Sequence, residues 1–367
     1  MKRICLVGVD NYLMLNPTDR NQSVNGEAVQ QVLLAKAFQE LGCDVSTIVV
    51  APGNRINERI NGIKVLSAFN RREGIPVVRF LHPRATGVFK ALRKADADIY
   101  FESPAGVFTG FTAAYCRAKQ RKFIFRIASD VDCKPGEQLI KYWRDRKIYE
   151  FGLRHADVRA VQSKHQAQLL KRHYGLDSTM VNMVLEEPKE KLDGERDIDV
   201  LWISNVKGVK RPDRLLALAE KLPGTNFTMI GGVVQEERDL YKVIERSATD
   251  LPNVNFLGAV PYQEVNQYVA RAKVFLNTSD IEGFPNTFLQ AWARKVPVVS
   301  YFDPDGIIKN RGLGRRPENE SEMRKALREL LDNESERSRI GEEAHAFAIT
   351  EYSAVAAAKR YLELCGQ

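Results

Sequence analysis

The chain contains 367 residues with a formal net charge of +8, and 44% of its residues are hydrophobic. This length exceeds what one hydrophobic core usually organises, so we expect two domains. No apolar run of about eighteen residues occurs, which excludes an ordinary membrane-spanning helix, and no cleavage-like segment follows the first apolar run, which favours a cytoplasmic protein.

Residues that bind transition metals are few and dispersed. The five cysteines include no Cys-x-x-Cys pair, and the five histidines are equally spread. This pattern argues against disulfides and against a zinc site. Four Asp-x-Asp pairs could each hold a divalent ion beside a diphosphate, but such pairs are common by chance, and we expect no metal.

The positive charge is concentrated in the first half of the chain. Residues 1–182 carry 29 Lys and Arg against 17 Asp and Glu, whereas residues 183–367 carry 26 against 30. Attraction to nucleic acid, to anionic lipid head groups or to a phosphorylated substrate would each produce this asymmetry. A merely solvated basic surface is an equally good explanation.

The first predicted elements are a strand, a helix and a second strand. Residues 3–9 form an apolar run typical of a buried parallel strand, and a polar loop follows over residues 10–25. A helix is predicted to begin at Asn25-Gly26 and to end at Gly42, before a strand over residues 45–50. Gly26 lacks a Cβ and would let a ligand approach the helix entry, although a glycine without a ligand would look the same.

A basic segment follows over residues 71–94. Its cationic side chains are interleaved with apolar Val77, Val78, Phe80 and Leu81, a pattern that suits contact with anionic lipid or with a lipid-linked acceptor. An ordinary solvated surface is the alternative. The basic residues are Arg71, Arg72, Arg79, Arg84, Lys90, Arg93 and Lys94.

Further strands are predicted over residues 98–101, 123–127 and 158–163. Polar residues follow the first two strands, at the edge where ligands bind in parallel α/β sheets, and Asp130 is the candidate there for acceptor binding. No histidine follows these two strand ends in the sequence. The charged stretch over residues 186–196 contains few apolar residues and is typical of a linker.

A second domain is predicted from a regular alternation of strands and helices, which is typical of a doubly wound sheet. Strands are expected over residues 200–204, 226–230 and 254–257, and helices over residues 212–221 and 261–272. Lys210 precedes Pro212, which suits the first turn of a helix. Gly231-Gly232 would permit either close approach of a ligand or a tight turn.

The densest pattern lies over residues 271–306, where a strand, a polar loop, a short helix and a second strand follow one another. Glu282 would lie at the carboxyl end of the first strand, where helix N-termini present free N–H groups. Gln290 lies four residues after Asn286 on the helix, so both could face the same cleft. Three closing helices are predicted over residues 318–331, 334–348 and 354–364.

Glu282-Gly283-Phe284-Pro285-Asn286, together with Pro297-Val298-Val299, resembles the donor-sugar signature of retaining family-four glycosyltransferases, which belong to glycosyltransferases group 1. The resemblance implies an α/β fold of two Rossmann-like doubly wound domains facing a cleft, known as GT-B. It implies an acceptor-binding domain over residues 1–185, a linker over 186–198 and a donor-binding domain over 199–345. A C-terminal helix over 346–367 would pack back on the first domain.

The resemblance also assigns roles to single residues. Glu282 would contact the transferred sugar and Lys210 the donor diphosphate, which makes these two the candidate catalytic residues. The family pattern has a glutamate where this chain has Gln290, whose amide could bond a ribose hydroxyl, and an arginine where it has Asn205, which supplies no permanent charge. The remaining candidates are, for the donor, Gly231, Gly232, Gly283, Phe284, Pro285 and Asn286 and, for the acceptor, Gly26 and Asp130.

The activity implied is retaining transfer of a hexose-type sugar from a UDP- or GDP-linked nucleotide sugar to a saccharide or lipid-linked acceptor. Polysaccharide or lipopolysaccharide biosynthesis would be its setting. No enzyme nucleophile, cofactor or metal is implied. The basic N-terminal half would make a peripheral contact with anionic membrane, at the inner face of the cell membrane.

Other functions stay open. A catalytically weakened homologue could bind a nucleotide sugar or serve as a scaffold, because both Asn205 and Gln290 depart from charged family residues. Another enzyme with the same fold, such as a nucleotide-sugar epimerase, would share these elements. A nucleic-acid binder is suggested only by the basic first half, and no recognised binding motif accompanies it, so no nucleic-acid partner is expected.

Overall fold

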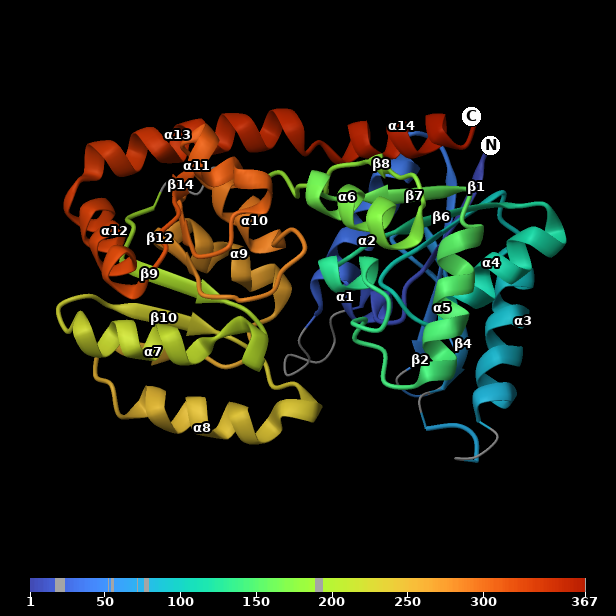
Figure 1. Cartoon of the computed structure of the whole chain (residues 1–367), viewed down its shortest axis with the longest axis horizontal. Helices are drawn as coiled ribbons and strands as arrows, with labels where there is room; N and C mark the ends of the chain where they lie inside the picture. Colours follow the sequence, from blue (N-terminus) through green and yellow to red (C-terminus); the bar gives the residue numbers. More distant parts are fainter. Residues whose placement is uncertain are drawn as a thin grey trace. The chain divides into compact units, whose positions relative to one another are not determined.

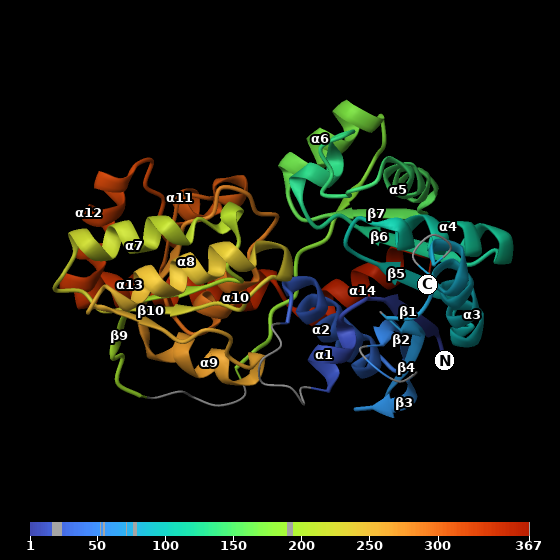
Figure 2. The same cartoon turned by 90° about the horizontal axis from the view of Figure 1, so that it is seen from below.

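The structure is a computed structural model that describes residues 1–16, 24–51, 53, 56–70, 72–75, 79–188 and 194–366. These residues form two compact units (Figures 1 and 2). The first unit comprises the described residues up to 184 together with 352–366, and the second those from 185 to 351. In the described parts of the chain, no helix combines the length and the apolar character needed to cross a bilayer.

The first unit is built on an eight-stranded sheet in the order β3-β4-β2-β1-β5-β6-β7-β8. Neighbouring strands are parallel, except that β3 and β4 pair antiparallel. The central strands are buried along nearly their whole length, as expected where helices cover both faces. The strands are β1 Arg3–Val7, β2 Asp44–Ala51, β3 Asn57–Ile60, β4 Ile63–Asn70, β5 Ile99–Glu102, β6 Lys122–Arg126, β7 Val158–Val161 and β8 Thr179–Met180.

Helices lie on both faces of this sheet. One face carries α3, α4 and α5, which lie side by side, and the other carries α2 and α14 (Figure 2). The helices are α1 Asn11–Leu15, α2 Gly26–Glu40, α3 Thr86–Ala95, α4 Val107–Lys119, α5 Trp143–His155, α6 Lys164–Tyr174 and α14 Ala354–Leu364. Two further turns are η1 Phe80–Ala85 and η2 Asp130–Cys133.

The last helix, α14, is part of the first unit although it ends the chain. It packs against α2, and its buried Tyr361 meets the ring of Phe101 edge-on, with centroids 5.2 Å apart. α14 packs there because it has an apolar face, on which Ala357, Ala358 and Tyr361 are all buried.

Two features of the first unit differ from the sequence predictions. The polar loop predicted over residues 10–25 contains α1, whose buried Asn11 donates to Gln31 Oε1 at 2.9 Å and to Thr47 Oγ1 at 3.0 Å. A five-residue helix held by such polar contacts carries no hydrophobic period, so no sequence pattern predicts it. The antiparallel β3–β4 hairpin was also not predicted. Of the basic segment, Arg71, Val77 and Val78 lie outside the described residues.

The second unit is built on a six-stranded parallel sheet in the order β11-β10-β9-β12-β13-β14. Its strands are β9 Ile198–Ile203, β10 Phe227–Ile230, β11 Val254–Phe256, β12 Ala272–Asn277, β13 Val298–Ser300 and β14 Gly314–Arg315. Its helices are α7 Pro212–Lys221, α8 Arg238–Thr249, α9 Tyr262–Arg271, α10 Asn286–Ala293, α11 Ile307–Arg311, α12 Glu320–Asp332 and α13 Glu334–Glu351. Three short turns are η3 Gly208–Lys210, η4 Gln235–Glu237 and η5 Pro304–Gly306.

The predicted architecture of two α/β units, each with a largely or wholly parallel sheet, is confirmed. Residues 186–188 and 194–197, within the predicted linker, form neither helix nor strand, and 189–193 of that linker lie outside the described residues. β9 begins at Ile198, and α13 continues to Glu351. The boundaries between the two units lie at residues 184/185 and 351/352.

Candidate functional site

The candidate site of the second unit lies at the carboxyl edge of its sheet. β9 and β12 are hydrogen-bonded neighbours, with Val200 opposite Val274. The loop after β9 leads through η3 into α7, and the loop after β12 leads into α10. Two segments about seventy residues apart in sequence therefore meet at the edge where parallel α/β sheets bind ligands.

Lys210 and Glu282 form an ion pair at this edge. The Lys210 ammonium lies 2.5 Å from Glu282 Oε2, and the two side chains are 22% and 11% exposed. Asn277, the last residue of β12, donates its amide to the other carboxylate oxygen, Oε1, at 3.3 Å. Both oxygens of Glu282 are thus held, and the carboxylate is oriented before any ligand arrives.

A second set of contacts fixes the backbone that carries Lys210. Thr278 is buried, and its hydroxyl donates to the carbonyl of Lys210 at 2.8 Å. The same hydroxyl accepts from the indole N–H of Trp202 at 2.9 Å, and the N–H of Asp280 donates to the carbonyl of Val209 at 2.9 Å. Neither Thr278 nor Trp202 was singled out from the sequence. The one available signal was an indole in a buried strand, which needs a partner for its N–H.

Arg211 follows Lys210 with a left-handed backbone, at φ 50°. Its guanidinium bonds Asp213, with Nε 2.9 Å from Oδ1, and also reaches Asp280 at 3.3 Å. Arg214 pairs with the other oxygen of Asp280 at 2.7 Å and donates to the carbonyl of Thr278 at 3.1 Å. These arginines hold the loop that follows β12 in place. Their positive charge is neutralised by the carboxylates of Asp213 and Asp280 rather than available to a ligand.

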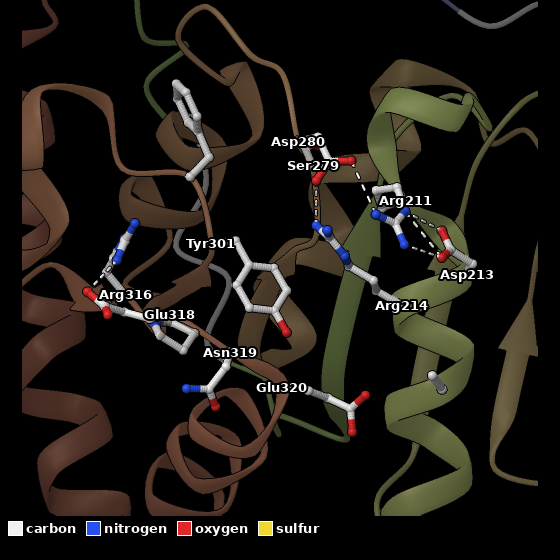
Figure 3. Close-up of a pocket in the computed structure, with 13 residues that line it drawn as sticks. Arg211, Asp213, Arg214, Ser279, Asp280, Tyr301, Arg316, Glu318, Asn319 and Glu320 are labelled. Carbon is white, nitrogen blue, oxygen red and sulfur yellow. Dashed lines mark hydrogen bonds and ion pairs between the residues drawn. The ribbon is translucent and has the colours of Figure 1, made fainter.

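Figure 3 shows the cavity that these arginines border, with Tyr301 between Arg214 and Arg316. Its volume is about 560 Å³, and three arginines and four carboxylates line it. Lys210 and Glu282 do not line it. Because its charges nearly cancel, this cavity is poorly suited to a diphosphate. The lining residues are Arg211, Asp213, Arg214, Ala217, Ser279, Asp280, Tyr301, Phe302, Arg316, Pro317, Glu318, Asn319 and Glu320.

The glycine pair after β10 has a structural explanation at its first position. A Cβ on Gly231 would lie 2.4 Å from the carbonyl oxygen of Ser204, so the end of β9 leaves no room for a side chain. The N–H of Gly231 donates to Gly258 at 2.8 Å, and the carbonyl of Gly232 accepts from Val206 at 3.0 Å. Asn205 lies between Ser204 and Val206 in the sequence and is half-buried.

The Gly283–Asn286 turn leads directly into α10. Phe284 is buried and meets Trp292 edge-on, with centroids 6.3 Å apart. Pro285 precedes the helix, and Asn286 is its first residue. Phe288 and Trp292 are fully buried on the side of this helix that faces the protein core. The apolar half of the motif therefore anchors α10.

Gln290 is buried and its polar contact is with α9. Its amide nitrogen donates to Asn266 Oδ1 at 3.2 Å, and Asn266 in turn lies 3.4 Å from Glu186 Oε2. Tyr262 donates to the same Glu186 oxygen at 2.8 Å, and burial together with that carboxylate raises the pKa of Tyr262. The network Glu186–Asn266–Gln290 was not predicted from the sequence, since it joins residues more than a hundred positions apart.

The two candidates for acceptor binding lie at the carboxyl edge of the first unit's sheet. Gly26 is the first residue of α2, whose N-terminus is capped by Asn25, with the Ala28 N–H 2.8 Å from Asn25 Oδ1. Asp130 begins η2, directly after β6. The sequence places no histidine after these strand ends, yet the fold brings His165 of α6 to 3.8 Å from Asp130 Oδ2.

The structure adds a buried charged cluster at the same edge. Arg126, the last residue of β6, is fully buried and pairs with Glu27 at 2.7 Å, while Ser103 donates to the same Glu27 oxygen at 2.6 Å. Burial raises the pKa of Glu102 well above its usual range and that of Asp132 to about 7. The Glu27–Arg126 pair was not predicted from the sequence, because the two residues are 99 positions apart.

No group of three or more His, Cys, Asp or Glu residues with metal-binding geometry occurs among the residues that the structure describes. All five cysteines are buried. In the second unit, the Lys210–Glu282 pair offers an oriented carboxylate and an ammonium group.

The comparison of the sequence with known families gives a match over nearly the whole second unit. Residues 184–347 match the family model described as glycosyl transferases group 1. A curated relative, the lipopolysaccharide core biosynthesis glycosyltransferase LpsE of Rhizobium meliloti (strain 1021), is 29% identical over 199 residues, which are 51% of this chain and 55% of that protein. The match thus spans about half the length of the curated relative.

Solved structures share the fold over essentially the whole chain. A sucrose-phosphate synthase from Thermosynechococcus elongatus has a TM-score of 0.78 at 15% identity, covering 100% of this chain and 99% of that one. Anabaena Alr3699/HepE in complex with UDP and glucose has a TM-score of 0.75 at 14% identity, covering both chains fully. WaaG, a glycosyltransferase involved in lipopolysaccharide biosynthesis, has a TM-score of 0.69 at 13% identity, covering 98% and 99%.

Proposed function

We propose that the chain is a glycosyltransferase acting on a nucleotide sugar, because residues 184–347 match the glycosyl transferases group 1 family. The transferred group is a hexose-type sugar, the donor is a UDP- or GDP-linked sugar, and the acceptor is a saccharide or a lipid-linked saccharide. The observation that carries this proposal is the Lys210–Glu282 pair at the carboxyl edge of the parallel sheet.

Each partner of this pair has a separate task. Negative charge develops on the diphosphate as it leaves, and the Lys210 ammonium stabilises that charge in the transition state. Glu282 accepts hydrogen bonds from sugar hydroxyls and so keeps the anomeric carbon aligned. The contact of Asn277 with Glu282 holds this carboxylate in place while the donor competes for Lys210.

The transfer retains the configuration at the anomeric carbon. The bond from that carbon to the phosphate oxygen breaks while the acceptor oxygen bonds on the same face, and the acceptor proton passes to the leaving phosphate. This step needs no protein nucleophile and no pair of carboxylates of the glycosidase kind. The donor is lined by the residues from Gly283 to Asn286 and by the backbone of Gly231 and Gly232. Gln290 contacts the ribose of the donor, because its side-chain amide can form further hydrogen bonds beside the one to Asn266.

The relatives support the choice of donor and setting. HepE was solved with UDP and glucose, and LpsE is described by its role in lipopolysaccharide core biosynthesis. We therefore propose UDP as the first nucleotide to test and polysaccharide or lipopolysaccharide assembly as the setting. Gly26 and Asp130 contact the acceptor, at the inner face of the cell membrane.

The test is ligand-induced thermal stabilisation of the full chain by UDP, GDP, ADP and their common sugars. One nucleotide should raise the Tm of the wild type, and Lys210→Ala should weaken that nucleotide's binding about tenfold or more, because a charge-assisted contact of about 1.5 to 3 kcal/mol is lost. Glu282→Ala should weaken binding of the nucleotide sugar more than binding of the free nucleotide.

Lys221→Ala is the matched control, because Lys221 lies at the opposite end of α7 in an exposed pair with Glu320. It should bind nucleotides as the wild type does. Absence of stabilisation by every nucleotide at saturating concentration would remove the donor-site proposal and favour a scaffold.

A catalytically weakened homologue is the second candidate, and one contact favours it. Gln290 is already engaged with Asn266 on α9, so its amide is committed in part to protein structure. Such a protein would be stabilised selectively by a nucleotide sugar, with loss in Lys210→Ala, but would release no nucleotide in the presence of saccharide acceptors.

A further inference from the structure

Trp143 is exposed at the surface of the first unit. Its side chain is 76% accessible, whereas the other two tryptophans of the chain, Trp202 and Trp292, are 2% and 0% accessible. It is the first residue of α5. Two further apolar side chains precede it, Leu139 at 83% and Tyr142 at 55%. A cluster of large apolar groups in water is a mark of an interaction surface.

A second segment continues this surface. Leu81 of η1 is 65% accessible and Phe89 of α3 is 37% accessible. The guanidinium of Arg144 lies 3.5 Å from the centre of the Phe80 ring, which joins the start of α5 to η1. The rings of Phe80 and Phe89 both pack on Phe111 of α4, at 5.8 and 5.7 Å. Figure 1 shows α3, α4 and α5 side by side in this part of the unit.

We define the aromatic-basic face by its exposed apolar residues and by the cations around them. The apolar residues are Leu81, Phe89, Leu139, Tyr142 and Trp143, and the cations are Arg79, Arg84, Lys90, Arg93, Lys94, Lys141, Arg144 and Lys147.

The charge of this face is strongly positive. Residues 79–94 contain five Lys and Arg and no Asp or Glu, and residues 139–147 contain four against the single Asp145. Two of the cations are paired, Arg144 with Asp145 at 2.8 Å and Lys147 with Glu150 at 2.9 Å. Burial and the neighbouring charge of Arg79 lower the pKa of Arg84.

We infer that the aromatic-basic face docks the protein onto a bilayer that contains anionic phospholipid. Trp143, Tyr142, Leu139 and Leu81 enter the head-group region, and the cations contact lipid phosphates. The combination explains both features at once, because Trp and Tyr prefer the membrane–water boundary and basic side chains are drawn to an anionic leaflet.

Charge complementarity selects lipid over a second copy of this face, since two copies would bring the same excess of cations together. The flexible stems of Lys and Arg also suit a fluid array of phosphates. This inference requires neither a donor site nor catalysis. It narrows the membrane contact expected of the basic N-terminal half to a surface formed by residues 79–94 and 139–147.

Trp143 supplies its own probe, because it is the one tryptophan of three that is accessible to solvent. The full chain is mixed with vesicles of phosphatidylcholine alone or with 30% phosphatidylglycerol. Anionic vesicles should shift the tryptophan emission to shorter wavelength, and lipids brominated in the acyl chain should quench it. Binding should weaken as salt is raised, because the electrostatic part is screened.

Two variants and their controls test the named residues. Trp143→Ala should weaken binding to anionic vesicles about tenfold. The triple change Lys90→Ala, Arg93→Ala and Lys94→Ala should weaken it by about fivefold for each cation removed. The controls lie in the second unit: Val243→Ala removes an exposed apolar residue, and Lys325→Ala with Arg328→Ala removes two exposed cations. Neither control should change binding.

Three results would overturn the inference. The first is no binding to anionic vesicles at low salt, and the second is binding without quenching of tryptophan by brominated lipid, which would place the contact elsewhere. The third is a blue shift that grows with protein concentration in the absence of vesicles, which would assign the face to a second copy. Nucleotide stabilisation of Tm is read separately, so failure here leaves the proposed donor site intact.

Discussion

At the residue scale, the position of Lys210 depends on one buried hydroxyl. Thr278 donates to the Lys210 carbonyl and accepts from the Trp202 indole, so a single side chain ties β9, η3 and the β12 loop together. Such a group is sensitive to substitution, because a change that keeps its shape but removes the hydroxyl leaves a buried donor and a buried acceptor without partners.

Thr278→Val should therefore lower the free energy of unfolding by about 2 to 3 kcal/mol and weaken nucleotide binding, because Lys210 loses its backbone support. Urea unfolding and nucleotide titration measure the two effects. Thr278→Ser keeps the hydroxyl and should therefore retain most of the stability and most of the nucleotide affinity of the wild type. Thr249→Val is the control, since Thr249 makes an exposed bond to the Glu245 carbonyl on α8, and its change should stay within about 0.5 kcal/mol. An unaltered nucleotide affinity in Thr278→Val would show that the loop does not position Lys210.

At the element scale, the end of β9 and the turn after β10 are packed backbone against backbone. Gly231 faces the Ser204 carbonyl at a distance that excludes a methyl group. The N–H groups of Ser204 and Val206 donate to Ile230 and Gly232, which keeps the two segments in register. This close approach determines how the chain runs from the end of β9 into η3, and thereby where Lys210 lies.

Gly231→Ala should destabilise the protein by about 1 to 3 kcal/mol, because the new methyl group forces the backbone of β9 to shift. Gly224→Ala is the matched control in the same unit, since a Cβ there meets nothing within 4 Å, and it should be neutral or stabilising by up to about 1 kcal/mol. Thermal and urea unfolding of both variants provide the measurement. Equal stability of the two variants would contradict the packing explanation of Gly231.

At the scale of the whole molecule, the chain returns to its first unit at its end. Residues 352–366 belong to that unit, and Tyr361 fills a site beside Phe101 and the buried guanidinium of Arg126. The α14 helix therefore contributes to the core of the first unit.

Tyr361→Ala should cost about 3 to 5 kcal/mol, as for the loss of a large buried aromatic side chain. Amide hydrogen exchange should rise in α2 and β5 of the first unit and stay unchanged in β9 and β12 of the second. Lys359→Ala, on the exposed side of α14, serves as the control. Faster exchange spread equally over both units would indicate that α14 does not belong to the first unit alone.

Most regular elements could be predicted from local sequence patterns, and Lys210 and Glu282 were chosen from the sequence as candidates for the proposed donor site. Strands such as 200–204 and 226–230 are apolar runs bounded by turn formers. Because this signal is local, their predicted positions agree with β9 and β10 to within a few residues. Glu282 and Lys210 were identified by their place after such strands and by resemblance to a family motif.

Which distant residues meet depends on how the strands are ordered and how the helices pack in the fold. The Lys210–Glu282 pair exists because β9 and β12 are neighbours in the sheet, a matter of strand order that no local pattern encodes. The same holds for Glu27 with Arg126, and for Arg144, which joins α5 to Phe80 and completes the aromatic-basic face. The hydrophobic periodicity of a segment indicates which of its own residues are buried. A site is formed by side chains from different segments that face one another in the fold.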